Sequence, residues 1–167
     1  MKKIIILLSV LTVAMTEALG QSIRGDFTPL QSESKVQIQL DYSKADIHGM
    51  TEDDFAVYEE DWNEDKPEII SKFVTACNKG IGYTPYLIIS RSTPYILKVD
   101  ILTIFDNGDC ILDASLINPE GLTIGTIENV RGEGGRFGTK LNLIKDGSED
   151  SGLQLGRLLK KAMKKRQ

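Results

Sequence analysis

The strongest constraint on the fold is a strand-like pattern that runs from Tyr86 to Val130. Apolar and polar residues alternate there with the period of half-buried strands, as in Leu97, Lys98 and Val99. The expected strands cover residues 86–90, 95–105, 110–117 and 122–130. They are joined by DNGD (106–109), a hairpin signal, and NPEG (118–121), which places proline and glycine as a tight turn requires. This pattern predicts an antiparallel meander with helices over one face only.

Apolar residues at helical spacing predict three helices. The first carries Phe55, Tyr58 and Trp62 on one side. The second is expected to begin at DKP (65–67), a cap followed by a first-turn proline, and to end at NKG (78–80). The last is expected over about 150–165, where two glycines four residues apart, at 152 and 156, would let it approach the sheet closely.

The order of elements predicts the fold class. An alternating strand over 35–42 is followed by two helices, a strand, the three-strand meander and the C-terminal helix. We therefore expect an α+β domain over 35–167, with a mixed, mostly antiparallel sheet covered by helices on one face. Residues 21–34 are expected to form an N-terminal extension ahead of this single domain.

The first residues predict export. Lys2 and Lys3 precede an apolar run over 4–15, and ALG (18–20) supplies small residues for a signal peptidase, so residues 1–20 are expected to be a signal peptide. The run is shorter than the roughly 20 apolar residues of a membrane span, and no cysteine at the cleavage region accepts a lipid. The mature chain should begin at Gln21 and be periplasmic or secreted.

Charge is unevenly distributed along the mature chain, which has 18 basic and 23 acidic residues once Lys2, Lys3 and Glu17 are removed. This balance argues against nucleic-acid binding. Nine carboxylates lie between 52 and 68, and six cations lie between 157 and 166. Such charges complement helix dipoles on solvated faces, whereas a calcium loop would need a D-x-D-x-D-G spacing that is absent. A basic tail that binds membranes is the alternative for the C-terminus.

The glycine-rich stretch RGEGGRFG (131–138) is the candidate binding site. Its tentative anion-binding residues are Arg131, Gly132, Gly134, Gly135, Arg136 and Lys140. The dinucleotide fingerprint fails, because its sixth position is Phe137, and the P-loop order is reversed in GTK (138–140), where no helix is expected to begin. The pattern favours a mobile connection pinned to the body by Phe137, with anion binding as the alternative.

Other chemical signals are weak. His48 is the only histidine, and neither a zinc set nor a G-x-S-x-G elbow is present, so neither an enzyme nor a cofactor is expected. Cys77 continues an apolar helical stripe, and Cys110 alternates in phase with buried positions. Two buried, unreactive thiols are favoured over a disulfide, because a helix packed on a sheet usually holds its Cα atoms beyond the roughly 4.4–6.8 Å that a bridge spans.

Four pieces of sequence carry a resemblance: YILKVDILTI, NPEGLTIGTI, GEGGRFGTKLNL and GLQLGRLLKKAMKK. Together they resemble small secreted proteins of Bacteroidota that have no assigned activity. More distantly, the element order is similar to the TolB N-terminal domain, curli-secretion lipoproteins and lipoprotein activators of penicillin-binding proteins. The resemblance implies an envelope module, and it provides no catalytic residue to carry over.

Two functions of different class follow from the sequence. The first is a non-enzymatic interaction module that binds an envelope protein or a cell-wall-associated partner. The second is a small-ligand or anion binder, or a hydrolase, centred on Arg131, Arg136 and Lys140. Stabilisation by phosphates, nucleotides, sugars or metals in a thermal-shift screen would indicate the second.

Overall fold

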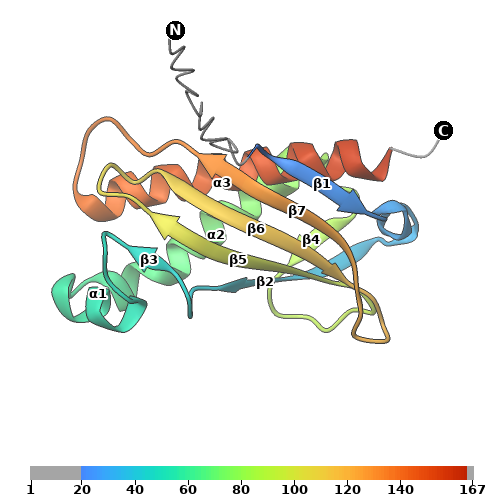
Figure 1. Ribbon diagram of the computed structural model, residues 1–167, viewed down its shortest axis with the longest axis horizontal. Helices are drawn as coiled ribbons and strands as arrows, with labels where there is room; N and C mark the ends of the chain where they lie inside the picture. Colours follow the sequence, from blue (N-terminus) through green and yellow to red (C-terminus); the bar gives the residue numbers. More distant parts are fainter. Residues whose placement is uncertain (1–19, 165–167) are drawn as a thin grey trace, which may run out of the picture.

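The computed structural model describes residues 20–164 (Figure 1). The expected signal peptide lies outside these residues, apart from Gly20, and so does the chain beyond residue 164. Seven strands form one mixed sheet in the order β1-β7-β6-β5-β2-β4, with β3 beside β5. The strands are β1 (Ser22–Gly25), β2 (Lys35–Asp41), β3 (Asp46–Ile47), β4 (Tyr86–Ile88), β5 (Ile96–Ile104), β6 (Cys110–Ile117) and β7 (Thr123–Gly132). The helices are the 3-10 turn η1 (Thr28–Ser32) and the α-helices α1 (Glu52–Tyr58), α2 (Trp62–Ile81) and α3 (Lys140–Met163).

The predicted α+β class and the meander are confirmed. Strands β5, β6 and β7 pair antiparallel in sequence order, while β2 runs parallel to both β4 and β5. Helices α2 and α3 lie side by side over one face of the sheet, where Leu97, Val99 and Leu112 are fully buried. Lys98 and Asp100 point to the other face and remain half-exposed.

The segment 21–34 belongs to the same sheet and core rather than forming an extension. Its strand β1 pairs antiparallel with β7, with Ile23 opposite Ile127. Phe27 and Leu30 are buried in the core. Phe27 packs so closely on β7 that a Cβ added to Gly125 would lie 2.6 Å from its ring. The sequence pattern missed this segment because β1 is short and has no clear alternation.

Helix α2 is longer at both ends than predicted. It begins at Trp62, so Pro67 lies inside the helix, where it has no N–H to donate to the carbonyl of the exposed residue Asn63. It ends at Ile81, followed by Gly82 in the left-handed conformation. The expected stop at residues 78–80 is wrong because Gly80 faces α3, where a Cβ would lie 2.5 Å from the Leu153 carbonyl oxygen.

Helix α3 begins at Lys140, ten residues before the predicted start. Thr139 caps it, with its side-chain oxygen accepting a hydrogen bond from the Asn142 N–H at 3.3 Å. The stretch KDGSEDSG (145–152) suggests a loop by composition, yet it is helical. Gly147 serves a close contact there, since an added Cβ would lie 1.9 Å from the Gly108 carbonyl oxygen in the β5–β6 turn.

Two further glycines in α3, Gly152 and Gly156, face α2. The prediction that they face the sheet is therefore wrong. A Cβ added to Gly152 would lie 2.3 Å from the Phe73 carbonyl oxygen, and one added to Gly156 would lie 2.2 Å from that of Cys77. The two helix backbones therefore approach more closely than side chains would allow. This contact fixes the helical layer against which the sheet packs.

The edge strand β4 is closed by a side chain of α2. Asn78 is buried, and its carboxamide nitrogen donates to the Leu87 carbonyl at 2.9 Å while its oxygen accepts from the Leu87 N–H at 2.7 Å. The amide of Asn78 thus occupies the place of a neighbouring strand at this residue.

The two cysteines are buried and free. Cys77 lies on α2, and burial raises the pKa of its thiol far above the ordinary range. Cys110 begins β6, and burial raises its thiol pKa to about 12, although a hydrogen bond with Ser151 opposes the shift. Both groups stay protonated at neutral pH, and a protonated thiol is a poor nucleophile.

We therefore expect neither thiol to react with a thiol-specific reagent in the native protein. After denaturation without a reductant, both should titrate. Native reactivity at either position, or a mass lower by two hydrogens with no free thiol on denaturation, would contradict the structure. The double variant Cys77→Ser/Cys110→Ser supplies the blank for this titration.

Among the described residues, no helix is long and apolar enough to cross a membrane.

Candidate functional site

The glycine-rich connection between β7 and α3 lies at one end of the molecule. Figure 1 shows it at the same end as α1 and the turn between β5 and β6. The turn is held against α3 by Gly108 and Gly147, and Gly134 lies on the Asn107 carbonyl. The connection is therefore docked on the turn through its backbone, and its side chains point outward.

Two amide groups of the loop donate hydrogen bonds to carboxylates of the protein. The N–H of Gly134 donates to Asp109 Oδ1 at 2.8 Å, and the N–H of Glu133 donates to Asp150 Oδ2 at 3.0 Å. The Gly135 N–H bonds the Leu143 carbonyl at 3.4 Å. The sequence predicts no helix start here, yet α3 begins directly after the loop. The amides of residues 133–135 are nevertheless already satisfied, which disfavours a phosphate cradle on this part of the loop.

The basic candidates of this loop have different surroundings. Arg131 is exposed on β7, and its Nε donates to Asn129 Oδ1 at 3.4 Å. Arg136 is exposed. Lys140 reaches α1, where its Nζ donates to the Tyr58 hydroxyl and lies 4.2 Å from the centre of the ring.

The glycine candidates serve packing. A Cβ on Gly132 would lie 2.3 Å from the Gly147 carbonyl oxygen, and one on Gly134 would lie 2.0 Å from that of Asn107. A Cβ on Gly135 would meet the Asp146 carboxylate at 2.3 Å. Their lack of a side chain is thus explained by neighbouring backbone and side-chain atoms.

We expect the double variant Arg131→Ala/Arg136→Ala to keep its free energy of unfolding within about 0.5 kcal/mol of the wild type, because both side chains are exposed. Inorganic phosphate should leave the Tm of both proteins unchanged in a thermal-shift assay. A phosphate-dependent rise in the wild-type Tm that the double variant loses would contradict this expectation.

The prediction that Phe137 fixes the loop to the body of the protein is wrong, since 89% of its surface is exposed. Three other large apolar residues are exposed at the same end: Val57 (82%) and Tyr58 (56%) on α1, and Phe105 (47%) at the end of β5. We call these four residues the α1-end patch. Tyr58 was expected on the buried side of a longer first helix, but α1 ends at Tyr58 and that side chain faces Lys140 instead.

Helix α1, which carries Val57 and Tyr58 of the patch, is anchored in the core through its opposite side. Phe55 is fully buried, and its ring lies 5.2 Å edge-on from that of Trp62 and 5.2 Å from that of His48. Thr51 caps α1 and accepts a hydrogen bond from the Asp54 N–H. Val57 is therefore presented outward by a helix whose opposite side is fixed in the core.

The single histidine lies beneath the patch. His48 Nδ1 is 3.4 Å from Asp106 Oδ1, and its side chain is 4% exposed while that of Asp106 is 91% exposed. Its Nε2 is buried without a hydrogen-bond partner in the described part of the chain. The ring is enclosed, so it has no route to a substrate, and it supports the turn that carries Phe105 and Asp106.

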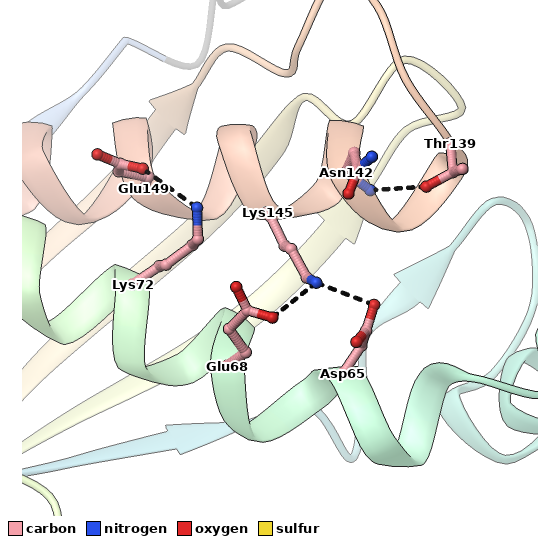
Figure 2. A network of polar contacts seen from close by, with 7 residues as sticks. All are labelled: Asp65, Glu68, Lys72, Thr139, Asn142, Lys145 and Glu149. Atoms are coloured by element: carbon pink, nitrogen blue, oxygen red, sulfur yellow. Dashed lines mark hydrogen bonds and ion pairs between the residues drawn. The ribbon is translucent and has the colours of Figure 1, made fainter.

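A groove with a volume of about 520 Å³ lies between α2 and α3. Figure 2 shows the ion pairs that join the two helices: Lys145 lies between Asp65 (3.0 Å) and Glu68 (2.8 Å), and Lys72 lies 3.9 Å from Glu149. Glu68, Lys72 and Glu149 are among the residues that line the groove. The hydrogen bond to Glu68 is the main reason that the pKa of Lys145 is raised. Lys79, Asp146 and Asp150 also line the groove and make no ion pair among the described residues, so the lining carries charge of both signs.

No group of three or more His, Cys, Asp or Glu side chains within residues 20–164 is placed to hold a metal ion.

Comparisons with known proteins give no family. No protein-family model matches the chain, and no curated protein has a significantly similar sequence. A single-residue variant of the PelC dodecamer from Paraburkholderia phytofirmans is 13% identical, with a TM-score of 0.46 over 84% of this chain and 98% of that chain. Another PelC dodecamer from that organism is 11% identical, with a TM-score of 0.46 over 80% and 98% of the two chains. A likeness at this level does not inform on function.

Proposed function

We propose that the protein is an exported, non-enzymatic interaction module, and that it binds an envelope protein or a cell-wall-associated partner. The observation that carries this proposal is the α1-end patch. Its four exposed apolar residues come from three separate segments, and these segments lie at the same end of the molecule. Single exposed apolar residues are common on protein surfaces, whereas a group of them marks an interaction site.

The energetics favour burial of the patch in a complex. Fully burying an apolar side chain of this size contributes about 1.5–3 kcal/mol relative to leaving it exposed. Phe137 and Val57 are almost fully exposed, so a partner that covers them gains most of that contribution. The basic, apolar and small-residue succession at the start of the sequence supports export.

The alternative of an anion-binding loop has less support. Asp109 and Asp150 accept the hydrogen bonds of the loop amides, and Lys140 is engaged by Tyr58. An anion that binds the amides of residues 133 and 134 would have to displace carboxylates of the protein itself.

In-cell photocrosslinking tests the proposal. A photoreactive phenylalanine analogue is placed at Val57 or Phe137, and at Leu122 or Ile89 as matched exposed apolar positions outside the patch. We expect a discrete crosslinked species from the patch positions in the cells that make the protein. If none of the four positions yields a crosslink to another protein or to the cell wall, the proposed function is wrong.

A further inference from the structure

We infer that the α1-end patch binds a peptide segment of its partner that carries lysine or arginine next to a large apolar side chain. This inference rests on the proposed function and specifies the chemistry of the partner. It is carried by three features of the same end of the molecule: a hollow lined by carboxylates and an aromatic ring, an excess of unpaired carboxylates, and the exposed apolar side chains.

The hollow lies beside Phe105 and has a volume of about 440 Å³. Asp106, Asn107 and Asp109 complete its lining. Asp106 is almost fully exposed, and Phe105 is half-exposed beside it. Carboxylates next to an aromatic ring suit a lysine or arginine side chain, through charge-assisted hydrogen bonds and a cation–π contact.

The carboxylates of α1 surround the patch with negative charge. Glu52 is paired with Lys66, and the carboxylates of Asp65 and Glu68 are paired with Lys145. Asp53, Glu60 and Asp61 are exposed and make no ion pair among the described residues. Three cations belong to the glycine-rich stretch and the start of α3: Arg131, Arg136 and Lys140. A hydrogen bond with Tyr58 is the main reason that the pKa of Lys140 is raised, and Glu59 and Asp106 add to the shift.

This charge selects among possible occupants. An anionic lipid surface or a nucleic acid would be repelled by the carboxylates. Two copies joined through the same patch would place like charges opposite each other. A basic segment would gain from the carboxylates, and its apolar side chain would cover Val57 or Phe137. Head-to-tail contact with the basic end of α3 in a second copy is a different occupant, which the experiment separates.

The test uses three fluorescent eight-residue peptides at physiological salt. They alternate lysine with leucine, lysine with serine, and glutamate with leucine, so that charge and apolar character vary separately. We expect the lysine–leucine peptide to bind the mature protein at least tenfold more tightly than either of the others, measured by fluorescence anisotropy. Amide shifts in NMR spectra should map to residues 52–61, 105–109 and 133–140.

Matched variants locate the site. Phe137→Ser and Asp106→Asn should each weaken the lysine–leucine peptide at least fivefold. Leu122→Ser and Glu120→Gln make the same chemical changes on the β6–β7 turn, at the opposite end of the molecule, and should stay within twofold. Phe137 makes no core contact, so Phe137→Ser keeps its fold even where Asp106→Asn disturbs the contact with His48.

Several outcomes would overturn the inference. Equal binding of both lysine peptides would show charge attraction alone, and tighter binding of the glutamate peptide would reverse the assigned charge. Equal losses in the matched variants would place the site elsewhere. Self-association in sedimentation that Phe137→Ser abolishes would identify a second copy as the occupant. Photocrosslinks from Leu122 or Ile89, with no peptide binding, would remove this inference and leave the proposed function intact.

Discussion

Replacing Gly156 with alanine is expected to lower the free energy of unfolding by about 3 kcal/mol, the upper part of the range for overpacked cores. Alanine is the better helix former by about 1 kcal/mol, so helix propensity alone predicts the opposite sign. The structure decides the sign because the added Cβ would lie 2.2 Å from the Cys77 carbonyl oxygen and 2.8 Å from the Ile81 nitrogen. Both are backbone atoms of α2, so relief requires the two helices to separate. Chemical denaturation of the protein measures the change.

The control for this prediction lies one residue away. Arg157 is exposed on the same helix, and Arg157→Ala should change the free energy of unfolding by no more than about 0.5 kcal/mol. Gly152→Ala should resemble Gly156→Ala, since its Cβ would meet the Phe73 carbonyl oxygen at 2.3 Å. A Gly156→Ala protein as stable as the wild type would show that α2 and α3 do not pack with their backbones in contact.

Five of the seven strands were predictable because their signal is local. Alternation in β5 and β6 and the turn residues between them depend on neighbours in sequence, and each of the five predicted strands lies within two residues of its expected position. The short strands β1 and β3 were not predicted. The predicted helix boundaries were wrong where a glycine is required by contact with a segment that is distant in the sequence. Gly147 and Gly80 suggest a loop or a helix end, but each is a glycine because another backbone passes too close for a side chain. Such a reason is invisible until the partner segment is known.

The candidate site was predictable only in part, for a similar reason. The glycine-rich loop was identified, but its amides are occupied by Asp109 and Asp150, which lie 25 and 17 residues away in sequence. Spacing within the loop cannot show this. The α1-end patch was missed altogether, because Val57 and Phe105 belong to elements whose common position depends on the parallel pairing of β3 with β5. An odd feature pointed to it: Phe137 is a large apolar residue in an otherwise polar, glycine-rich stretch.

Replacing the buried Asn78 with alanine is expected to lower the free energy of unfolding by a similarly large amount. Asn78→Ala removes both partners of Leu87 at once, the acceptor of its N–H and the donor to its carbonyl. An unsatisfied buried polar group costs about 1–3 kcal/mol, so we expect the free energy of unfolding to fall by about 3 kcal/mol. Asn63→Ala, on an exposed position of the same helix, should change it by no more than about 0.5 kcal/mol. Equal effects of the two substitutions would contradict the assigned role.

Hydrogen exchange and self-association separate this role from a simple loss of packing. The Leu87 amide should exchange slowly in the wild type and much faster in Asn78→Ala, because it donates its hydrogen bond to the Asn78 carboxamide oxygen. The same substitution frees the outer edge of β4, and an open edge is a template for pairing with another chain. We therefore expect Asn78→Ala, but not Asn63→Ala, to self-associate at high concentration. An amide of Leu87 that already exchanges rapidly in the wild type would mean that α2 does not close this edge.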